Sequence, residues 1–286
     1  MVKVIETVSE MQSYTGKEKS KGNTVALVPT MGALHAGHMA LVKTAKARAD
    51  KVVASIFVNP TQFNNPDDLK AYPRTWEADL AKLNTAEADA VFYPAAEEMY
   101  PQGYATTVCV DSPITQTLEG AHRPGHFDGV ATVVSKLFMA VQPDLALFGE
   151  KDYQQLQLIK RFTRDLNMPI KVRGVPTVRE EDGLALSSRN VRLTEQERKI
   201  APALHHILQN MAQALLMGER DYQNLEQKAA DKLLQSGFSS VDYIAIRRAD
   251  NLSIPSNNDN PADLRILAAA DLGTARLIDN IAVLHR

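Results

Sequence analysis

Residues 24–30 read TVALVPT and residues 31–38 read MGALHAGH, and this stretch decides the fold. The first seven residues form a short apolar run of the kind that a buried strand makes. From Leu34 to Asp50 the apolar residues recur at helical spacing instead, and this pattern predicts a helix. A buried strand that leads directly into a helix is typical of the repeating unit of α/β proteins.

The same alternation continues on the C-terminal side of this stretch. Strand-like runs alternate with helical patterns along the sequence. The strands are apolar almost throughout rather than at every second residue. This pattern predicts a Rossmann-like, doubly wound parallel sheet, in which ligands bind beyond the carboxyl ends of the strands. Further strands are expected at residues 51–59, 89–94, 106–110, 145–148 and 170–178, and further helices at residues 69–83, 127–141 and 153–166.

The pattern changes near Glu180. Residues 194–197 read TEQE, which fits a capping box, so a long helix is expected from Thr194 to Met217. A second helix is expected at residues 220–234, followed by strands joined by turns. We therefore predict two domains: a Rossmann-like domain at residues 1–180 that binds the ligands, and a smaller α+β domain at residues 181–286 that closes over them as a lid. The expected strands of the second domain are residues 241–247, 264–269 and 275–283.

Composition narrows the possible functions. The 286 residues carry 32 basic and 34 acidic side chains, a net charge of −2, so nucleic acid is not expected as a partner. No stretch approaches 18 uninterrupted apolar residues, and the first nine residues are unlike a signal peptide, so a cytoplasmic protein without membrane partners is expected. The single cysteine, Cys109, lies in the apolar run VCV, which predicts a buried structural thiol rather than a nucleophile.

His35 and His38 form the first candidate site. The start of a helix offers unpaired N–H groups and the positive end of a dipole, which suits a phosphate. Two histidines three residues apart share one helix face, and both can donate hydrogen bonds to a triphosphate. Gly37 lets a ligand approach the backbone closely. Two alternatives remain: the histidines only cap the helix, or they bind zinc, for which the sequence offers no obvious third ligand.

Amide side chains follow the next strand. Asn59 and Gln62 come after residues 51–59, where a ligand of a parallel sheet would lie. Neutral amides can hold a hydroxyl or a carboxylate without adding charge. The alternative is that both residues only cap a loop.

Lys151 and Asp152 lie at another junction between a strand and a helix. The lysine can neutralise phosphate charge, and the aspartate can accept from a ribose hydroxyl. Gln155, one turn later, can face the same site. A surface ion pair with Asp152 as helix cap, and a solvated helix face for Gln155, are the alternatives.

Ser187, Ser188 and Arg189 offer two hydroxyls and a guanidinium at the expected domain junction. This set can clamp a phosphate, although it can also be an ordinary polar loop. His122 and His126 flank Arg123-Pro124-Gly125 and are either site residues or ordinary turn and capping residues. Only Arg123 and His126 are expected to support the site.

Five blocks together carry a resemblance to a known family. A strand followed by H-x-G-H and a helix is similar to the HIGH-type nucleotidyltransferases, and the wider string PTMGALHAGH resembles the signature of the pantothenate synthetases (pantoate–β-alanine ligases). Ala36 departs from the pattern, since many members carry an acidic residue there, but both histidines are in place. The blocks span nearly the whole chain and are PTMGALHAGH (29–38), FVNPTQF (57–63), EGAHRPGHF (119–127), FGEKDYQQL (148–156) and DGLALSSRN (182–190).

The resemblance implies a reaction and its participants. Pantoate is activated by ATP as pantoyl adenylate with release of pyrophosphate, and β-alanine then displaces AMP to give pantothenate. Mg²⁺ is implied on the phosphates with no assigned protein ligand, and the oligomer implied is a homodimer. Another nucleotidyltransferase and a non-catalytic ATP-binding protein are the alternatives. The implied catalytic residues are His35, His38, Lys151, Ser187, Ser188 and Arg189.

The resemblance also assigns residues to the two ligands. For ATP they are Met31, Gly37, His38, Gly149, Lys151, Asp152, Thr177, Val178, Ser187, Ser188 and Arg189. For pantoate they are Met31, Asn59, Gln62, Phe148 and Gln155.

Overall fold

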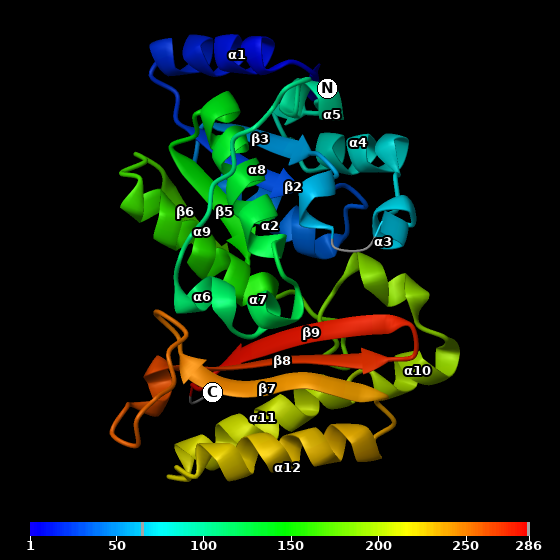
Figure 1. Cartoon of the computed structure of the whole chain (residues 1–286). Helices are drawn as coiled ribbons and strands as arrows, with labels where there is room; N and C mark the ends of the chain where they lie inside the picture. Colours follow the sequence, from blue (N-terminus) through cyan, green and yellow to red (C-terminus); the bar gives the residue numbers. More distant parts are fainter. Residues whose placement is uncertain (64–65, 285–286) are drawn as a thin grey trace. The chain divides into compact units, whose positions relative to one another are not determined.

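The strand β2 (Val25–Thr30) lies at the middle of a six-stranded parallel sheet, in a computed structural model that describes residues 1–63 and 66–284 (Figure 1). Its neighbours are β3 (Lys51–Ile56) and β5 (Leu145–Gly149), and all three strands run in parallel. The strand order is β1-β4-β3-β2-β5-β6. From β2 the chain adds β3 and β4 on one side of this strand. It then crosses back and adds β5 and β6 on the other side, so the strand order reverses between β2 and β5.

Helices cover both faces of this sheet. Ala26 and Val28 of β2 pack in one cluster with Leu41, Val42 and Ala45 of α2. The helices α1 and α8 contact each other and β2. The prediction of a doubly wound α/β fold is therefore confirmed. The remaining strands are β1 (Lys3–Ile5), β4 (Ala90–Phe92) and β6 (Lys171–Val175), and the helices are α1 (Val8–Ser20), α2 (Ala36–Lys46), α3 (Pro66–Lys70), α4 (Trp76–Thr85), α5 (Ala96–Met99), α6 (Pro113–Gln116), α7 (Glu119–His122), α8 (His126–Val141) and α9 (Tyr153–Asp165).

A second, antiparallel sheet forms from the last third of the chain. Its order is β7-β8-β9, with β7 (Ser240–Arg248), β8 (Leu264–Leu272) and β9 (Ala275–Ala282). Two helices, α11 (Ala203–Leu216) and α12 (Tyr222–Gln235), contact this sheet and each other, and α10 (Glu195–Ile200) precedes them. The expected C-terminal α+β architecture is confirmed.

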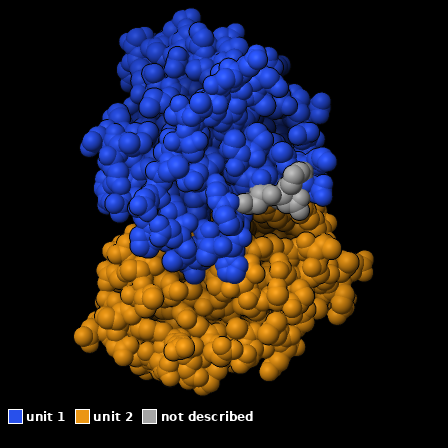
Figure 2. Space-filling model, viewed as in Figure 1, with its two compact units in different colours: residues 1–150, 155–176 blue, residues 151–154, 177–286 orange. Residues whose placement is uncertain are grey.

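The chain divides into two compact units, coloured separately in Figure 2. Unit 1 consists of residues 1–150 and 155–176, and unit 2 of residues 151–154 and 177–286. The short segment 151–154 thus groups with unit 2, although the residues on both sides of it group with unit 1. None of the helices within residues 1–63 and 66–284 is long and apolar enough to cross a membrane.

Two predicted helices are each divided. The helix expected at residues 69–83 is replaced by α3 and α4, since Pro73 lies between them and the residue before a proline avoids helical geometry. The helix expected from Thr194 to Met217 ends at Ile200 and restarts at Ala203, after Pro202. The capping box at Thr194 and Glu197 is present as expected.

The prediction for Cys109 is wrong. Residues 106–110, all of which the structure describes, form no strand, and Cys109 is exposed. The segment is tied to α8 instead, since the Val108 N–H donates to Thr132 Oγ1 at 2.9 Å. Local desolvation, followed by the charge of Asp128, raises the pKa of the Cys109 thiol, so a nucleophilic role remains disfavoured.

Candidate active site

A tight turn joins β2 to α2. Gly32 and Ala33 both have positive φ angles, +82° and +49°, so the chain turns sharply just before His35. Gly32 is needed here, because a side chain would be strained at this φ and its Cβ would lie 3.2 Å from Ile56. The turn places the start of α2 directly beyond the carboxyl end of β2.

Asp79 of α4 fixes this turn. The carboxylate is 1% exposed and accepts hydrogen bonds from the backbone N–H groups of Ala33 and Leu34, at 2.8 and 2.7 Å. Lys82, one turn further along α4, donates to the Leu34 carbonyl at 2.6 Å. The same helix therefore holds the turn through donors and acceptors at once. Sequence reasoning missed Asp79, which is 46 residues from Ala33 and carries no motif of its own.

His35 and His38 begin α2, as the sequence predicted. The backbone N–H of Gly37 donates to His35 Nδ1 at 3.1 Å, and that of His35 donates to His38 Nδ1 at 3.3 Å, which makes a capping box. Because both Nδ1 atoms accept hydrogen bonds, each neutral imidazole carries its proton on Nε2. The two rings lie 4.1 Å apart. The histidines therefore cap the helix, and the same bonds make each Nε2–H a donor that suits a phosphate.

Gly37 is required by the same cap. A Cβ at this position would lie 2.8 Å from Cε1 of His35, so any side chain would displace the imidazole. The small residue thus permits the close approach of the ring to the backbone.

Asn59 orients Gln62. The Gly129 carbonyl can only accept and the Thr61 N–H can only donate, so Asn59 must direct Nδ2 to the former (3.2 Å) and Oδ1 to the latter (3.4 Å). Asn59 Nδ2 also donates to Gln62 Oε1 at 3.0 Å. Gln62 is therefore held with its NH₂ group on the other side, where Nε2 lies 3.4 Å from Met31 Sδ. Gln62 Nε2 therefore remains the donor that this pair of amides can offer to a ligand.

Asn59 itself is 1% exposed, and Tyr100 donates to its Oδ1 at 2.7 Å. These contacts match the loop-capping alternative for Asn59. Arg123 and His126 support the same loop, because Arg123 Nη2 lies 3.4 Å and His126 Nδ1 2.9 Å from the Gln62 carbonyl oxygen.

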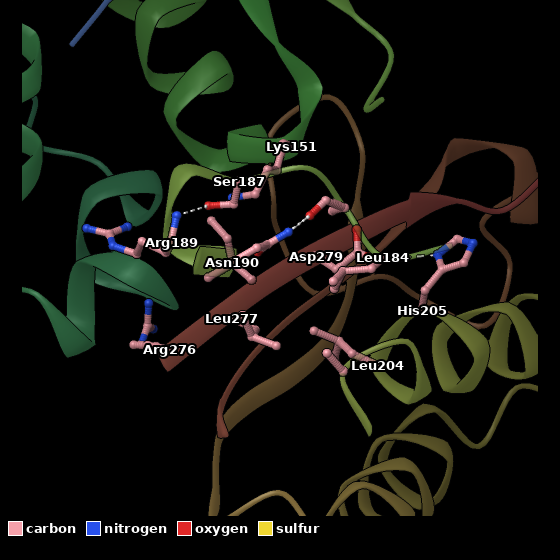
Figure 3. Close-up of a pocket in the computed structure, with 13 residues that line it drawn as sticks. Lys151, Leu184, Ser187, Arg189, Asn190, Leu204, His205, Arg276, Leu277 and Asp279 are labelled. Atoms are coloured by element: carbon pink, nitrogen blue, oxygen red, sulfur yellow. Dashed lines mark hydrogen bonds and ion pairs between the residues drawn. The ribbon is translucent and has the colours of Figure 1, made fainter. Parts of the chain in front are cut away.

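Unit 2 gathers the other candidate donors. Lys151, Ser187 and Arg189 line one small pocket of about 20 Å³, which has room for about one water molecule (Figure 3). Ser187 caps the short 3₁₀ helix that contains Ser188, since its Oγ accepts from the Arg189 N–H at 3.2 Å. The polar-loop alternative thus describes part of what Ser187 does.

A buried ion pair fixes the loop that carries these residues. Arg179 binds Asp279 through two hydrogen bonds of 2.7 and 2.8 Å, and also donates to the Gly183 carbonyl at 3.0 Å. His205 Nδ1 lies 3.4 Å from Asp279. Burial alone would raise the pKa of Asp279, but the nearby His205 imidazole and the hydrogen-bonded Arg179 guanidinium hold it below its usual range. Asp279 is therefore charged at neutral pH.

The remaining predicted residues are divided between the two units. Gly149 ends β5 and Phe148 is buried within it, while Gln155 is half-buried on α9 and Asp152 is exposed. In unit 2, Val178 pairs its carbonyl with the Leu186 N–H, and Thr177 Oγ1 is buried with no hydrogen-bond partner among the described residues. Such a hydroxyl needs a partner from a ligand or water.

No group of three or more His, Cys, Asp or Glu side chains within the described residues can hold a metal ion. A zinc site at His35 and His38 therefore has no third ligand there.

The fold and these donors define a Rossmann-like nucleotide-binding enzyme. The family model described as pantoate-beta-alanine ligase matches residues 3–282. The chain belongs to the pantoate–β-alanine ligase family and is an ATP-dependent ligase that condenses pantoate with β-alanine.

Relatives of known name cover the chain almost completely. Pantothenate synthetase from Paramagnetospirillum magneticum is 52% identical over 282 residues, which are 99% of this chain and 98% of the relative. The protein of the same name from Azotobacter vinelandii is also 52% identical over 282 residues, with 98% of each chain covered.

Solved structures agree with the fold. The crystal structure of pantothenate synthetase from Thermus thermophilus is 47% identical, covers 99% of this chain and 100% of its own, and has a TM-score of 0.91. That of pantoate-beta-alanine ligase from Francisella tularensis, complexed with beta-gamma ATP and beta-alanine, is 36% identical with a TM-score of 0.83, and covers 99% and 98% of the two chains.

Proposed function

We propose that the condensation proceeds in two half-reactions through a pantoyl adenylate. A carboxylate oxygen of pantoate attacks the α-phosphorus of ATP, and the bond from that phosphorus to its bridging oxygen breaks, so pyrophosphate leaves. The neutral amine of β-alanine then attacks the acyl carbon, the bond from this carbon to the phosphate oxygen breaks, and AMP leaves while the amine's surplus proton passes to water. The substrate carboxylate is the nucleophile, so no protein nucleophile is required.

The observation that carries this proposal is the family match over residues 3–282. It favours the ligase over the two alternatives, another nucleotidyltransferase and a non-catalytic ATP-binding protein. The reaction needs hydrogen-bond donors toward phosphate and carboxylate oxygens rather than a nucleophile of the protein. Catalysis then consists of positioning the substrates and stabilising the charge that develops on the phosphates.

The donors of unit 1 suit these tasks. His35 and His38 are proposed to donate from Nε2 to the phosphates, since their Nδ1 atoms accept from the backbone. Gln62 is proposed to donate from Nε2 to pantoate, because Asn59 occupies its Oε1. The resemblance adds Gln155, Met31 and Phe148 to the pantoate residues, and Gly37 to the ATP residues.

The residues of unit 2 are proposed to act on ATP. Lys151, Ser187, Ser188 and Arg189 supply cationic and hydroxyl donors for the phosphates. By the resemblance, Gly149 and Asp152 are proposed to contact the ribose, and Thr177 and Val178 the adenosine. The buried Thr177 hydroxyl, which has no partner among the described residues, supports a polar contact at this place.

The role proposed for Mg²⁺ is that of an ion carried by ATP. Magnesium in nucleotide enzymes is usually held by the substrate phosphates and one or two carboxylates rather than by a cage of protein ligands. That pattern suits a chain whose described residues form no cluster of three or more metal-binding side chains. Bound in this way, Mg²⁺ would neutralise phosphate charge.

Two further proposals rest on the sequence and the resemblance. The C-terminal domain is proposed to act as a lid that protects the adenylate from hydrolysis. The chain is also proposed to work as a cytoplasmic homodimer, which its molar mass in solution, measured by light scattering, would test.

One incubation tests the reaction. The chain is incubated with ATP, Mg²⁺ and pantoate, with and without β-alanine, and the products are identified by mass. Pyrophosphate and enzyme-bound pantoyl adenylate are expected without β-alanine, and AMP and pantothenate with it. Formation of pantothenate together with ADP and inorganic phosphate would contradict an adenylate intermediate.

A further inference from the structure

Asn280 of β9 bonds to the backbone of Lys151. Its Nδ2 donates to the Lys151 carbonyl oxygen at 2.8 Å, although the two residues are 129 positions apart. Asn280 is only 3% exposed, so the donor of this hydrogen bond is buried. Lys151 begins the four-residue segment 151–154 that groups with unit 2. The last strand of the chain therefore fixes the backbone at the start of this segment.

The orientation of the Asn280 amide is determined by its neighbours. Arg265 Nε can only donate, and it lies 2.7 Å from Asn280 Oδ1, whereas the Lys151 carbonyl can only accept. These two neighbours thus determine which amide atom of Asn280 is the oxygen and which is the nitrogen. The Arg265 guanidinium also lies over the ring of Tyr153, 3.9 Å from its centre. Two residues of the second sheet, Asn280 and Arg265, therefore hold the segment 151–154 at both its backbone and its aromatic side chain.

The residue before Asn280 holds the other donor segment of unit 2. Asp279 binds Arg179, and Arg179 in turn donates to the carbonyls of Gly183 and Asn280. The loop that begins at Gly183 leads to Ser187 and Arg189, which line the same pocket as Lys151 (Figure 3). Two consecutive residues of β9 thus anchor the two segments that carry the proposed phosphate donors.

We propose that Asn280 is a positioning residue for Lys151: it fixes the backbone from which the ammonium group reaches the ATP phosphates during adenylation. This inference rests on the proposed role of Lys151. A lysine side chain is long and flexible, so its charge is placed accurately only if its backbone is fixed. A displacement of about 1 Å can cost about 100-fold in rate.

The test uses Asn280→Asp, which keeps the shape but sets a carboxylate oxygen against the Lys151 carbonyl. We expect kcat for pyrophosphate exchange with ATP and pantoate to fall about 10- to 100-fold, with the KM for pantoate unchanged. Asn280→Ala, which removes both hydrogen bonds without adding charge, should have an effect in the same direction. Asn251→Asp is the matched control, because Asn251 is exposed in the same unit and its side chain accepts from the nearby Ser253 N–H.

A double variant separates positioning from a general structural effect. If Asn280 acts through Lys151, Asn280→Asp has almost no further effect on kcat in the Lys151→Ala background. An equal loss of rate in both backgrounds would overturn the proposal, as would loss of the folded circular dichroism spectrum in both Asn280 variants. If Lys151→Ala alone keeps the wild-type rate, the role proposed for Lys151 is wrong, and that failure is seen without any Asn280 variant.

Discussion

Asn59 Nδ2 donates to Gln62 Oε1 at 3.0 Å, and this hydrogen bond determines which end of the Gln62 amide is available to a substrate. The orientation follows from two backbone groups, the Gly129 carbonyl and the Thr61 N–H, whose roles cannot be exchanged. The donors of Gln62 are thereby set before any ligand binds. Preorganisation of this kind lowers the cost of binding a carboxylate or hydroxyl.

Replacement of Asn59 by Asp should weaken pantoate binding. The new carboxylate oxygen would face Gln62 Oε1, so the Gln62 amide would turn and present its oxygen instead of its NH₂ group. We expect the KM for pantoate to rise about 10-fold or more, the scale of one lost hydrogen bond with an unpaired partner, while the KM for ATP stays nearly constant. Steady-state kinetics measure both values. Asn224→Asp on the exposed surface of α12 is the control, and equal increases in both KM values would contradict the assignment.

The imidazole of His38 should contribute to adenylation. His38→Ala removes one preorganised donor, which typically costs about 10²- to 10³-fold in rate. Pyrophosphate exchange measures this step, and circular dichroism checks that the variant remains folded. His206→Ala, on the exposed face of α11, should leave the rate unchanged. A His38→Ala rate close to that of wild type would remove His38 from the mechanism.

Asp79 should act on the nucleotide through the turn at Ala33 and Leu34. In Asp79→Asn, one of the two backbone N–H groups faces an NH₂ group and loses its acceptor, which costs about 1–3 kcal/mol in the free energy of unfolding. The displaced turn should also raise the KM for ATP more than that for pantoate. Urea unfolding and kinetics report the two effects, and Asp231→Asn on the surface of α12 is the control. A stability loss without any change in the KM for ATP would limit Asp79 to a structural role.

The pair of Arg179 and Asp279 should stabilise unit 2 over a wide pH range. Removal of one partner of a buried ion pair costs about 3–5 kcal/mol, so Asp279→Asn should lower the free energy of unfolding by about this amount. The pKa of Asp279 is lowered by folding, so its contribution is present above the ordinary value of 3.8 and is lost only as pH falls through the lower folded pKa.

Urea unfolding at several pH values tests this behaviour. The difference between wild type and Asp279→Asn should stay constant from pH 7 down to about pH 4.5 and shrink only below the ordinary aspartate pKa of 3.8. Closure of the gap between about pH 7 and 5 would contradict a lowered pKa of Asp279. Asp250→Asn is the comparison, because the ion pair of Asp250 and Arg248 is screened by solvent and should contribute little to stability at any pH.

The lid proposal predicts protection by ATP. Residues 180–190 should be cleaved more slowly by trypsin when ATP and Mg²⁺ are present, because Arg189 would then be engaged by the phosphates. Mass spectrometry of the fragments locates the cleavage. Cleavage after Arg220, which lies outside this segment, is the internal reference, and an unchanged rate at Arg189 would contradict the proposal.

The central fold was predictable because its signals are local. The strands β2, β3 and β5 are continuous apolar runs, and the strings around His35 and Lys151 follow strand ends directly. The first strand and helix were missed for equally local reasons. β1 has only three residues, and the buried positions of α1 include Thr15 and Glu18, so no apolar stripe is visible.

The supports of the candidate site were not predictable from sequence. Asp79, Asn280 and Asp279 contact their targets from 46 to 129 residues away, and each is an ordinary polar residue in its own segment. Their function depends on strand order and on helix placement, which no local pattern contains. The sequence predicted Asn59 and Ser187 as site residues, but the backbone groups that they contact could be identified only from the structure.

The grouping of residues 151–154 with unit 2 has a consequence for how this protein can be divided. The chain passes between its two units three times, after residues 150, 154 and 176, so no single cut separates them. A fragment that begins at Thr177 would lack the Lys151 carbonyl that accepts from Asn280 and the Tyr153 ring under Arg265. The C-terminal unit is thus not a transferable module, and recombination between relatives should preserve function best when both segments come from the same parent.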